Sequence, residues 1–319
     1  MNKLTSLLAA GTVAAATLGA AAPAFAWPDR PIEIVVGFAA GGGTDITART
    51  LALHLGKALG GSVVVNNKPG ASGAIGLSYV ARARPDGYTL GMTNFPGLLT
   101  LPIEREAGFT TADFSYLGNL VRDPSAFSVA LDSSYRNIAD VIAAAKKAPG
   151  TISYGSTGAG TDDHLQMVMF EELTGTKLLH VPYQGAGPLK NAMLGGHVAI
   201  GGLNLGEVMP QAGKTMRPLA QASARASTLA TEVPTFKDQG VDLVFASERG
   251  IVAPKGLPAE VEQKIAAALR QIAASAEFQA QMKQQFTEMD YLPGAEWKKR
   301  LDASEAGFRR MWAKKRWTD

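Results

Sequence analysis

Two glycine-rich segments of the chain have a composition and spacing that can bind an anion. One spans residues 39–45 (AAGGGTD) and the other spans residues 156–162 (STGAGTD), and both end in Gly-Thr-Asp. Each segment follows a predicted strand and leads into a predicted helix, where backbone N–H groups and about half a positive charge of helix dipole are exposed. Each is therefore a potential anion site. Two such segments that face each other could hold one carboxylate from both sides.

The same residues also have a purely structural interpretation. Glycine before a helix is common in tight turns, because it adopts backbone conformations that other residues avoid, and Thr or Asp is a frequent helix N-cap. For one segment alone the two interpretations are equally good. The pattern occurs twice along the chain, which favours the anion site while the structural alternative stays open.

Nucleotide-binding and hydrolase motifs do not match the spacing of these glycines. The first segment lacks the G-x-G-x-x-G order, the predicted strand over residues 63–65 is followed by Asn66 where a dinucleotide fold has an acid, and no G-x-x-x-x-G-K-[ST] loop occurs. Residues 155–158 (GSTG) are one residue short of the G-x-S-x-G turn of hydrolases. A hydrolase that uses Ser156 and His164 is therefore the weaker alternative, and we predict a binding protein with no catalytic residue.

Residue types argue against thiol and metal chemistry as well. The chain has no cysteine, so it forms neither a disulfide nor a thiolate metal site. Its histidines show no close spacing of the H-E-x-x-H kind that metal ligands have; they are His54, His164, His180 and His197. We therefore predict no metal and no cofactor.

The amino-terminal segment has the features of an export signal. Lys3 gives a positive start, residues 7–22 form an apolar run that is too short to span a membrane, and residues 24–26 (AFA) fit a small-residue cleavage site. Cleavage after Ala26 would leave Trp27 as the first residue. We expect a soluble periplasmic monomer, and the absence of cysteine excludes a lipid anchor on that residue type.

The net charge of the chain is small. The full sequence carries +3, and removal of Lys3, the one charged residue before the cleavage site, leaves +2. This balance is too small to indicate a nucleic-acid partner. A late cluster of basic residues between Lys298 and Arg316 is interleaved with apolar residues at helical spacing, which predicts a solvated helix face.

Strands and helices alternate along the chain in two modules, which is typical of mainly parallel α/β sheets flanked by helices. Strands are predicted over residues 32–38, 63–65, 88–93, 152–154, 179–181, 198–203, 218–222 and 243–252. Helices are predicted over about 46–59, 74–83, 138–147, 165–173 and, near the end, 261–272 and 297–311. The last two have one apolar face and should pack on the outside of a sheet.

Two places where charge, Pro or Gly interrupt the apolar pattern predict crossings between the modules. They are residues 120–125 and 240–245. We therefore expect a first lobe made of residues 27–123 and 243–319, and a second lobe made of residues 124–242.

Several short segments, in order along residues 27–319, carry a resemblance to a known family. They are residues 27–32 (WPDRPI), 36–42 (VGFAAGG), 67–71 (NKPGA), 85–90 (PDGYTL), 180–185 (HVPYQG) and 195–198 (GGHV). Together they resemble the Bug receptors, the binding components of tripartite tricarboxylate transporters. The resemblance implies a type II periplasmic-binding-protein fold, in which two α/β lobes joined by a hinge enclose a small organic acid and deliver it to membrane permease subunits.

The resemblance also implies which residues bind the ligand. In that family a ligand carboxylate is held mainly by backbone groups and ordered waters from the two glycine-rich segments. The predicted ligand-binding residues are Phe38, Ala40, Gly41, Gly42, Gly43 and Asp45 on one side, and Ser156, Thr157, Gly158, Gly160 and Thr161 on the other. The Thr161 hydroxyl is expected to donate a hydrogen bond to the carboxylate.

One segment departs from the family pattern. Before residues 250–254 (GIVAP) the family usually has an aromatic residue, often Trp, whereas this chain has Glu248 and Arg249. Arg249 is a further predicted ligand-binding residue, because its guanidinium fits a second carboxylate at the ligand end remote from the glycines. Alternatively, Glu248 and Arg249 pair with each other at the rim. A monocarboxylate and a dicarboxylate both stay open, as does a role as a ligand sensor for a signalling partner.

Overall fold

Three parallel strands begin the sheet in the computed structural model, which describes residues 27–318. β1 (Ile32–Val36) lies between β2 (Val63–Asn67) and β3 (Thr89–Met92) and pairs in parallel with both. Helices α1 (Gly43–Leu59) and α2 (Ala74–Ala81) make the two connections. The β-branched run of β1 is almost entirely buried, as expected for a central strand that is covered on both faces.

The longest strand, β4 (Phe114–Ala130), changes partners along its length. Its first part pairs antiparallel with β9 (Ala246–Pro254) and β10 (Glu288–Pro293), and β9 also pairs with β3. Its last part pairs with β7 (Ile200–Asn204) and β8 (Met216–Gln221). The change of partner falls between Pro124, opposite Ala246, and Ser125, opposite Asn204. Strand β4 thus continues through the segment where the sequence pattern is interrupted.

A second set of parallel strands lies beyond β4. β5 (Ser153–Ser156) pairs in parallel with β6 (Leu179–Pro182) and with β7. Helices α5 (Asp162–Thr174) and α6 (Ala186–Leu194) connect these strands. The strand order of the whole sheet is β2-β1-β3-β9-β4-β7-β5-β6, with β8 and β10 paired to β4 off this path.

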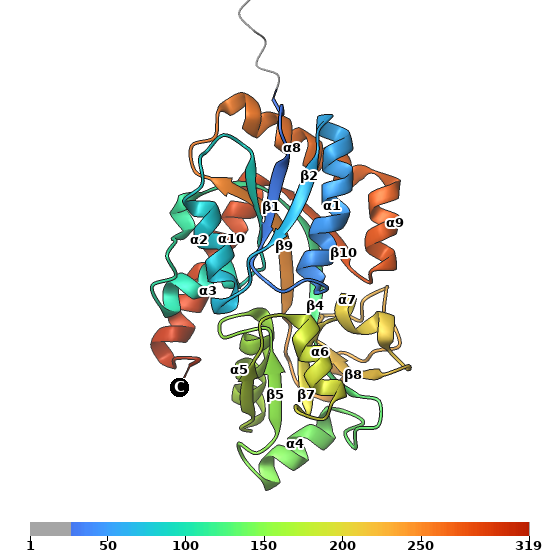
Figure 1. The fold of residues 1–319 in the computed structure, drawn as a ribbon. Helices are drawn as coiled ribbons and strands as arrows, with labels where there is room; N and C mark the ends of the chain where they lie inside the picture. The colour runs from blue at the N-terminus through green and yellow to red at the C-terminus, as the bar shows by residue number, and fades with distance from the viewer. Residues whose placement is uncertain (1–26, 319) are drawn as a thin grey trace, which may run out of the picture.

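The remaining helices divide between the two halves of the molecule (Figure 1). They are α3 (Gly97–Glu104), α4 (Ile138–Lys147), α7 (Leu205–Val208), α8 (Ala259–Ala274), α9 (Ala276–Gln284) and α10 (Gly294–Lys314). We call the half with β1, β2, β3, β9, β10, α1–α3 and α8–α10 lobe 1, and the half with β5–β8 and α4–α7 lobe 2. Strand β4 belongs to both. Lobe 1 lies above lobe 2 in Figure 1.

Each lobe has its own hydrophobic core. In lobe 1 the core between the sheet and α1 contains Ile34, Leu51 and Ile265, which have no exposed surface. In lobe 2 the rings of Phe127 and Phe170 pack with centroids 4.8 Å apart. These cores, one on each side of the shared strand β4, confirm the predicted two-lobed α/β fold.

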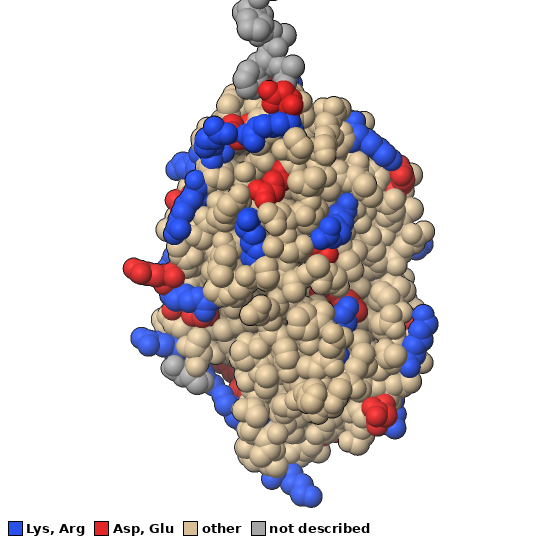
Figure 2. Space-filling model, viewed as in Figure 1, with Lys and Arg blue, Asp and Glu red and all other residues tan. Residues whose placement is uncertain are grey.

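The two closing helices pack as the sequence predicts. On α10, Trp297, Leu301 and Phe308 are buried against the sheet, whereas the basic residues of this helix are mostly exposed. On the face shown in Figure 2, blue and red side chains are scattered over the surface and around the outline and do not gather into one large patch of either sign.

The export signal predicted over residues 1–26 lies outside the described residues. Among residues 27–318, no helix is both long enough and apolar enough to span a membrane. The lobe boundaries predicted at residues 123 and 243 stay a prediction.

Candidate functional site

The two glycine-rich segments lie at equivalent places in the two lobes. The first follows β1 and leads into α1, and the second follows β5 and leads into α5. Both β1 and β5 are parallel strands, and the carboxyl ends of such strands are where open α/β sheets bind ligands. The N-cap residues, Gly42 of α1 and Thr161 of α5, make no side-chain capping bond. The backbone N–H groups at both helix starts are therefore left to other acceptors.

In the first segment, Asp45 supports the loop from within lobe 1. Its carboxylate accepts hydrogen bonds from the backbone N–H of Gly41 at 2.9 Å, from Arg49 at 3.0 Å and from Asn67 at 2.9 Å. Burial raises the pKa of Asp45, but the hydrogen bonds from these three partners outweigh it and lower the pKa below its usual value. Gly41 has a φ of +83°, a conformation that favours glycine.

In the second segment, most polar groups bond within lobe 2. The Thr161 hydroxyl donates to the carbonyl of Gly158 at 2.7 Å, and the Thr157 hydroxyl donates to Asp163 at 2.6 Å. The backbone N–H of Gly160 donates to Nδ1 of His164 at 3.1 Å. Thr161 therefore braces the loop in this closed form, and its predicted hydrogen bond to a ligand stays a prediction.

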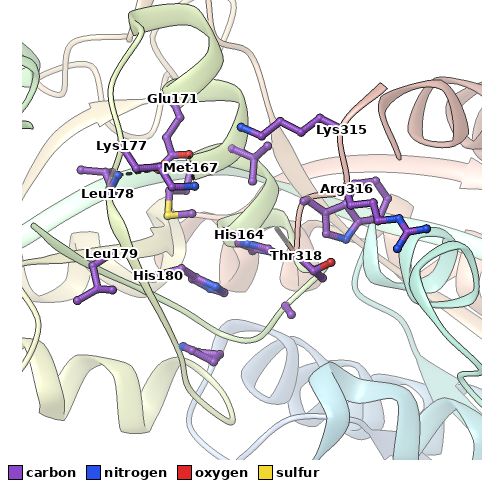
Figure 3. A pocket seen from close by; sticks show the side chains of 14 residues that line it. His164, Met167, Glu171, Lys177, Leu178, Leu179, His180, Lys315, Arg316 and Thr318 are labelled. Carbon is purple, nitrogen blue, oxygen red and sulfur yellow. Dashed lines mark hydrogen bonds and ion pairs between the residues drawn. The ribbon is translucent and has the colours of Figure 1, made fainter. Parts of the chain in front are cut away.

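Ser156 contacts His180 rather than His164, its partner in the hydrolase alternative. Ser156 Oγ lies 2.6 Å from Nε2 of His180, and Ser156 has no exposed surface. His164 and His180 stack with ring centroids 3.9 Å apart beside a pocket of about 380 Å³, between α5, β6 and residues 315–318 (Figure 3). Burial, with His180 and Lys177 nearby, lowers the pKa of His164 to about 3, and burial lowers the pKa of His180 to about 4.

A small polar cavity separates the lobes at the amino end of α1. Its volume is about 10 Å³, which is room for roughly one water molecule. Residues from both lobes line it: Phe38, Gly42, Gly43, Thr44, Asn94, Thr157, Ala186, Asn204 and Glu207. The structure thus brings Phe38, Gly42, Gly43 and Thr157 together, as a site shared by both glycine-rich segments requires.

The other predicted residues of the two segments do not line this cavity; they are Ala40, Gly41, Asp45, Ser156, Gly158, Gly160 and Thr161. Two of them pack against lobe 1 instead. A Cβ built on Gly158 would lie 2.5 Å from the Ser72 hydroxyl, and the carbonyl of Gly160 accepts from the Thr100 hydroxyl at 2.5 Å. The second segment is therefore in close contact with lobe 1, and the lobes are closed.

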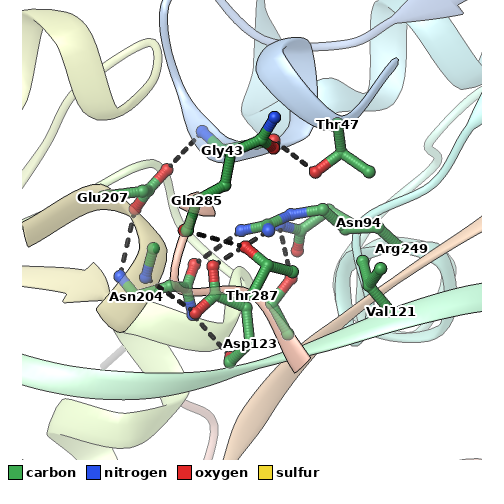
Figure 4. A network of polar contacts seen from close by, with 12 residues as sticks. Gly43, Thr47, Asn94, Val121, Asp123, Asn204, Glu207, Arg249, Gln285 and Thr287 are labelled. Atoms are coloured by element: carbon green, nitrogen blue, oxygen red, sulfur yellow. Dashed lines mark hydrogen bonds and ion pairs between the residues drawn. The ribbon is translucent and has the colours of Figure 1, made fainter. Parts of the chain in front are cut away.

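Glu207 is the main site residue that the sequence analysis missed. It belongs to α7 of lobe 2, and its Oε1 accepts from the backbone N–H of Gly43 in lobe 1 at 2.7 Å. Its Oε2 accepts from the backbone N–H of Asn204 at 3.0 Å, which completes a capping box (Figure 4). The one local signal was the spacing Asn-x-x-Glu at residues 204–207, which is typical of a helix start. That spacing does not reveal a contact with the other lobe.

Arg249 lies next to the first glycine-rich segment, so its expected position at the remote end of a ligand is wrong. A Cβ built on Gly43 would lie 2.5 Å from Nη2 of Arg249. The guanidinium is 1% exposed; Nη1 donates to Asp123 at 2.9 Å and Nη2 donates to Asn204 at 3.3 Å (Figure 4). Burial raises the pKa of Asp123 to about 7, although Arg249 acts in the opposite direction. Whether Arg249 contacts a ligand stays a prediction.

The alternative pairing of Glu248 with Arg249 is not formed. Glu248 accepts from the indole N–H of Trp297 at 3.3 Å and lies 3.1 Å from Arg300. Neighbouring residues of a strand point to opposite faces of the sheet, so Glu248 faces α10 while Arg249 faces Gly43 and Asp123.

No group of three or more His, Cys, Asp or Glu side chains among residues 27–318 is arranged to hold a metal ion. The chemistry that the cavity offers is the binding of an anion, through backbone N–H groups at a helix start with Arg249 beside them. Two α/β lobes that close over such a cavity define a solute-binding protein of the periplasmic type.

Comparison with known proteins places the chain within this class. The model of the tripartite tricarboxylate transporter family receptor matches residues 47–301. The "UPF0065 protein in gbd 5'region" of Cupriavidus necator is 36% identical over 262 residues, which cover 81% of this chain and 80% of that protein. Protein BugT of Bordetella pertussis is 35% identical over 267 residues, which cover 79% and 80%. The chain therefore belongs to the tripartite tricarboxylate transporter receptor family, which confirms the resemblance.

Solved structures agree with this assignment. The periplasmic binding protein BugD superposes with a TM-score of 0.85 at 31% identity, over 90% of this chain and 98% of that chain. Rpa4515 of R. palustris, solved with adipate, superposes with a TM-score of 0.86 at 29% identity, over 90% and 97%. The predicted periplasmic solute-binding fold is confirmed.

Proposed function

We propose that this protein binds a small organic carboxylate between its two lobes and delivers it to the membrane permease subunits of a tripartite tricarboxylate transporter. The observation that carries the proposal is the environment of the Gly43 N–H. That group lies at the positive end of a 17-residue helix and already holds a buried carboxylate, that of Glu207. The same position suits the carboxylate of a ligand.

The ligand class follows from the site and from one relative. Beside Gly43, Arg249 is a second group that favours negative charge. The structure of Rpa4515 with adipate supports a linear dicarboxylate as one member of the class. We keep both mono- and dicarboxylates as ligands, bound mainly by the two glycine-rich segments with Arg249 beside the first of them.

Binding would be coupled to a hinge motion of the lobes. We propose that residues 27–123 and 243–318 move together against residues 124–242, with β4 and the start of β9 as the connection. Carboxylate contacts from both lobes favour the closed form only as far as the affinity for that form exceeds the affinity for the open form. We further propose export to the periplasm, cleavage after Ala26 and a monomeric state.

The test is a thermal-shift and calorimetry screen with acetate, hexanoate, succinate, adipate, citrate, glutamate and benzoate. An acid at one hundred times its dissociation constant should stabilise the fold by about 2.7 kcal/mol. No shift and no heat with any of these acids would contradict the proposal.

The variant Gly42→Ala tests whether the ligand binds at the first glycine-rich segment. A Cβ at this position would lie 3.5 Å from Ala186 and 3.6 Å from Glu207, which are ordinary contacts, so the fold should tolerate it. The added methyl group occupies the space that a ligand carboxylate needs, and we expect affinity to fall at least tenfold. Gly307→Ala, in the middle of α10, is the matched control and should bind with wild-type affinity. Equal affinities of all three proteins would place the ligand elsewhere.

A further inference from the structure

Glu207 makes a contact between the lobes that its local role does not explain. The bond from Oε2 to the Asn204 N–H closes a capping box within its own short helix, as many helix starts do. The bond from Oε1 crosses to the Gly43 N–H of lobe 1. Figure 4 shows the carboxylate between these two backbone groups. One oxygen therefore serves α7, and the other joins lobe 2 to lobe 1.

Two features beside this contact attract a negative group. The N-cap residue Gly42 has no side chain to offer to the positive end of α1. The guanidinium of Arg249 also lies next to Gly43, and its Nε is buried without a hydrogen-bond partner. Glu207 itself is only 7% exposed. Its bond to Gly43 is thus a charge-assisted hydrogen bond shielded from water, which is the strong kind.

A ligand carboxylate cannot occupy the same place together with Glu207. Glu207, Gly42 and Gly43 line one cavity of about 10 Å³, which has room for roughly one water molecule. A carboxylate group is larger than a water molecule. It can reach the Gly43 N–H only when the Glu207 carboxylate has moved away.

We propose that Glu207 is a built-in substitute for the ligand carboxylate: it holds the lobes closed in the absence of ligand, and a ligand must displace it from Gly43. This inference rests on the proposed function. It makes Glu207 a determinant of affinity, because every acidic ligand competes with an anion that the protein itself supplies. Like charge adds to the competition, because the displaced Glu207 stays close to the incoming carboxylate.

The first experiment examines the ligand-free protein. Glu207→Ala removes both acceptor oxygens, and Glu207→Gln keeps the shape but removes the charge and leaves one oxygen, which can accept from the Asn204 N–H or from the Gly43 N–H but not from both. Glu260→Gln, on the exposed start of α8, is the control for loss of one negative charge. We expect hydrogen exchange of the Gly43 amide to be at least tenfold faster in Glu207→Ala, and the radius of gyration from X-ray scattering to rise. An unchanged exchange rate and radius would overturn the inference.

The second experiment measures affinity for the same panel of acids by calorimetry. Glu207→Ala should bind the acids about tenfold more tightly than the wild type, with Glu207→Gln between them and Glu260→Gln unchanged. Binding by the wild type that Glu207→Ala weakens or leaves unchanged would overturn the inference and leave the proposed function intact. Absence of binding in every protein would overturn the proposed function, and the competition with it.

Discussion

At the residue scale, one buried cation faces several buried carboxyl groups between the lobes. Arg249 is the only Lys or Arg side chain that is fully buried among residues 27–318, and Asp123, Asp162 and Glu207 all lie near enough to affect its pKa. Burial of an unpaired charge is costly. Each of these carboxyl groups must therefore pair with the one guanidinium, accept a hydrogen bond from a backbone N–H group or become protonated. Burial raises the pKa of Asp123 to about 7 and the pKa of Asp162 to about 6, although Arg249 acts in the opposite direction on both.

Replacing Arg249 tests this arrangement. Arg249→Met should lower the free energy of unfolding by about 3–5 kcal/mol at pH 8, because it leaves Asp123 buried and ionised without a cation. The pKa of Asp123 is higher in the folded protein than in the unfolded chain, so its protonation stabilises the fold fully at a pH below the pKa of the unfolded chain. That stabilisation is lost as the pH rises through the pKa in the folded protein, which is about 7. The loss in the variant should therefore be smaller at pH 6, where Asp123 is largely protonated.

Urea denaturation at both pH values measures this difference. Arg270→Met, on the exposed side of α8, is the control and should change stability by less than about 0.5 kcal/mol. A loss for Arg249→Met that is the same at pH 6 and pH 8 would show that packing, rather than charge pairing, is the role of Arg249.

At the element scale, β9 and α10 approach so closely that only glycine fits between them. Gly250 of β9 lies under the buried ring of Trp297, the first large apolar residue of α10. A Cβ on Gly250 would lie 2.5 Å from this ring and 2.7 Å from the carbonyl of Gly118. The backbone carbonyl cannot move without disturbing the pairing of β4 with β9. Glycine at this position therefore sets the distance between helix and sheet.

The variant Gly250→Ala should lower the free energy of unfolding by about 1–3 kcal/mol through overpacking. Gly307→Ala makes the same chemical change in the interior of α10, where the nearest atom would be 4.0 Å away. That variant should raise stability by about 0.5–1 kcal/mol, because alanine favours the helix more than glycine does. Thermal or urea unfolding of the two variants should give opposite signs. A stabilised Gly250→Ala would disprove the close approach.

At the scale of the whole molecule, β4 carries residues of both cores. Leu117, Leu120 and Val121 pack in lobe 1, and Phe127 and Val129 pack in lobe 2. The same strand pairs with β9 in one lobe and with β7 in the other. Loss of one core therefore removes support from a strand that the other core needs, and we expect the lobes to unfold together.

The variant Phe127→Ala tests this coupling. Phe127 has no exposed surface and contacts the rings of Tyr154, Phe170 and Phe236 in lobe 2, so its truncation should cost about 3–5 kcal/mol. Three of the four tryptophans, Trp27, Trp297 and Trp312, lie in lobe 1, and Trp317 lies between lobe 1 and α5 of lobe 2, so the fluorescence reports mainly on lobe 1. We expect fluorescence and circular dichroism to show one coincident transition at lower urea.

Leu53→Ala, at an exposed position of α1, should leave both transitions in place. A fluorescence transition that keeps its wild-type midpoint in Phe127→Ala, while circular dichroism shifts, would mean that the lobes unfold independently.

Much of this protein follows from local patterns of the sequence. Strand–helix alternation predicts the two α/β modules, and the order Gly-Thr-Asp predicts that a helix starts after β1 and after β5. Family motifs spread along the chain predict the solute-binding class. These features depend on neighbouring residues or on a repeat of short motifs. They can therefore be predicted without knowing which distant parts of the chain are in contact.

Only the tertiary structure decided which side chains occupy the cavity. Glu207 is far from Gly43 in the sequence, and its local spacing indicates only a capping box. In the structure its carboxylate also accepts a hydrogen bond from Gly43 of the other lobe. The sequence pattern predicts Arg249 at the far end of a ligand, whereas the pairing of β9 with β4 brings it to Asp123. Long-range contacts of this kind depend on strand register and on how two lobes close, and neither of these is encoded in the spacing of nearby residues.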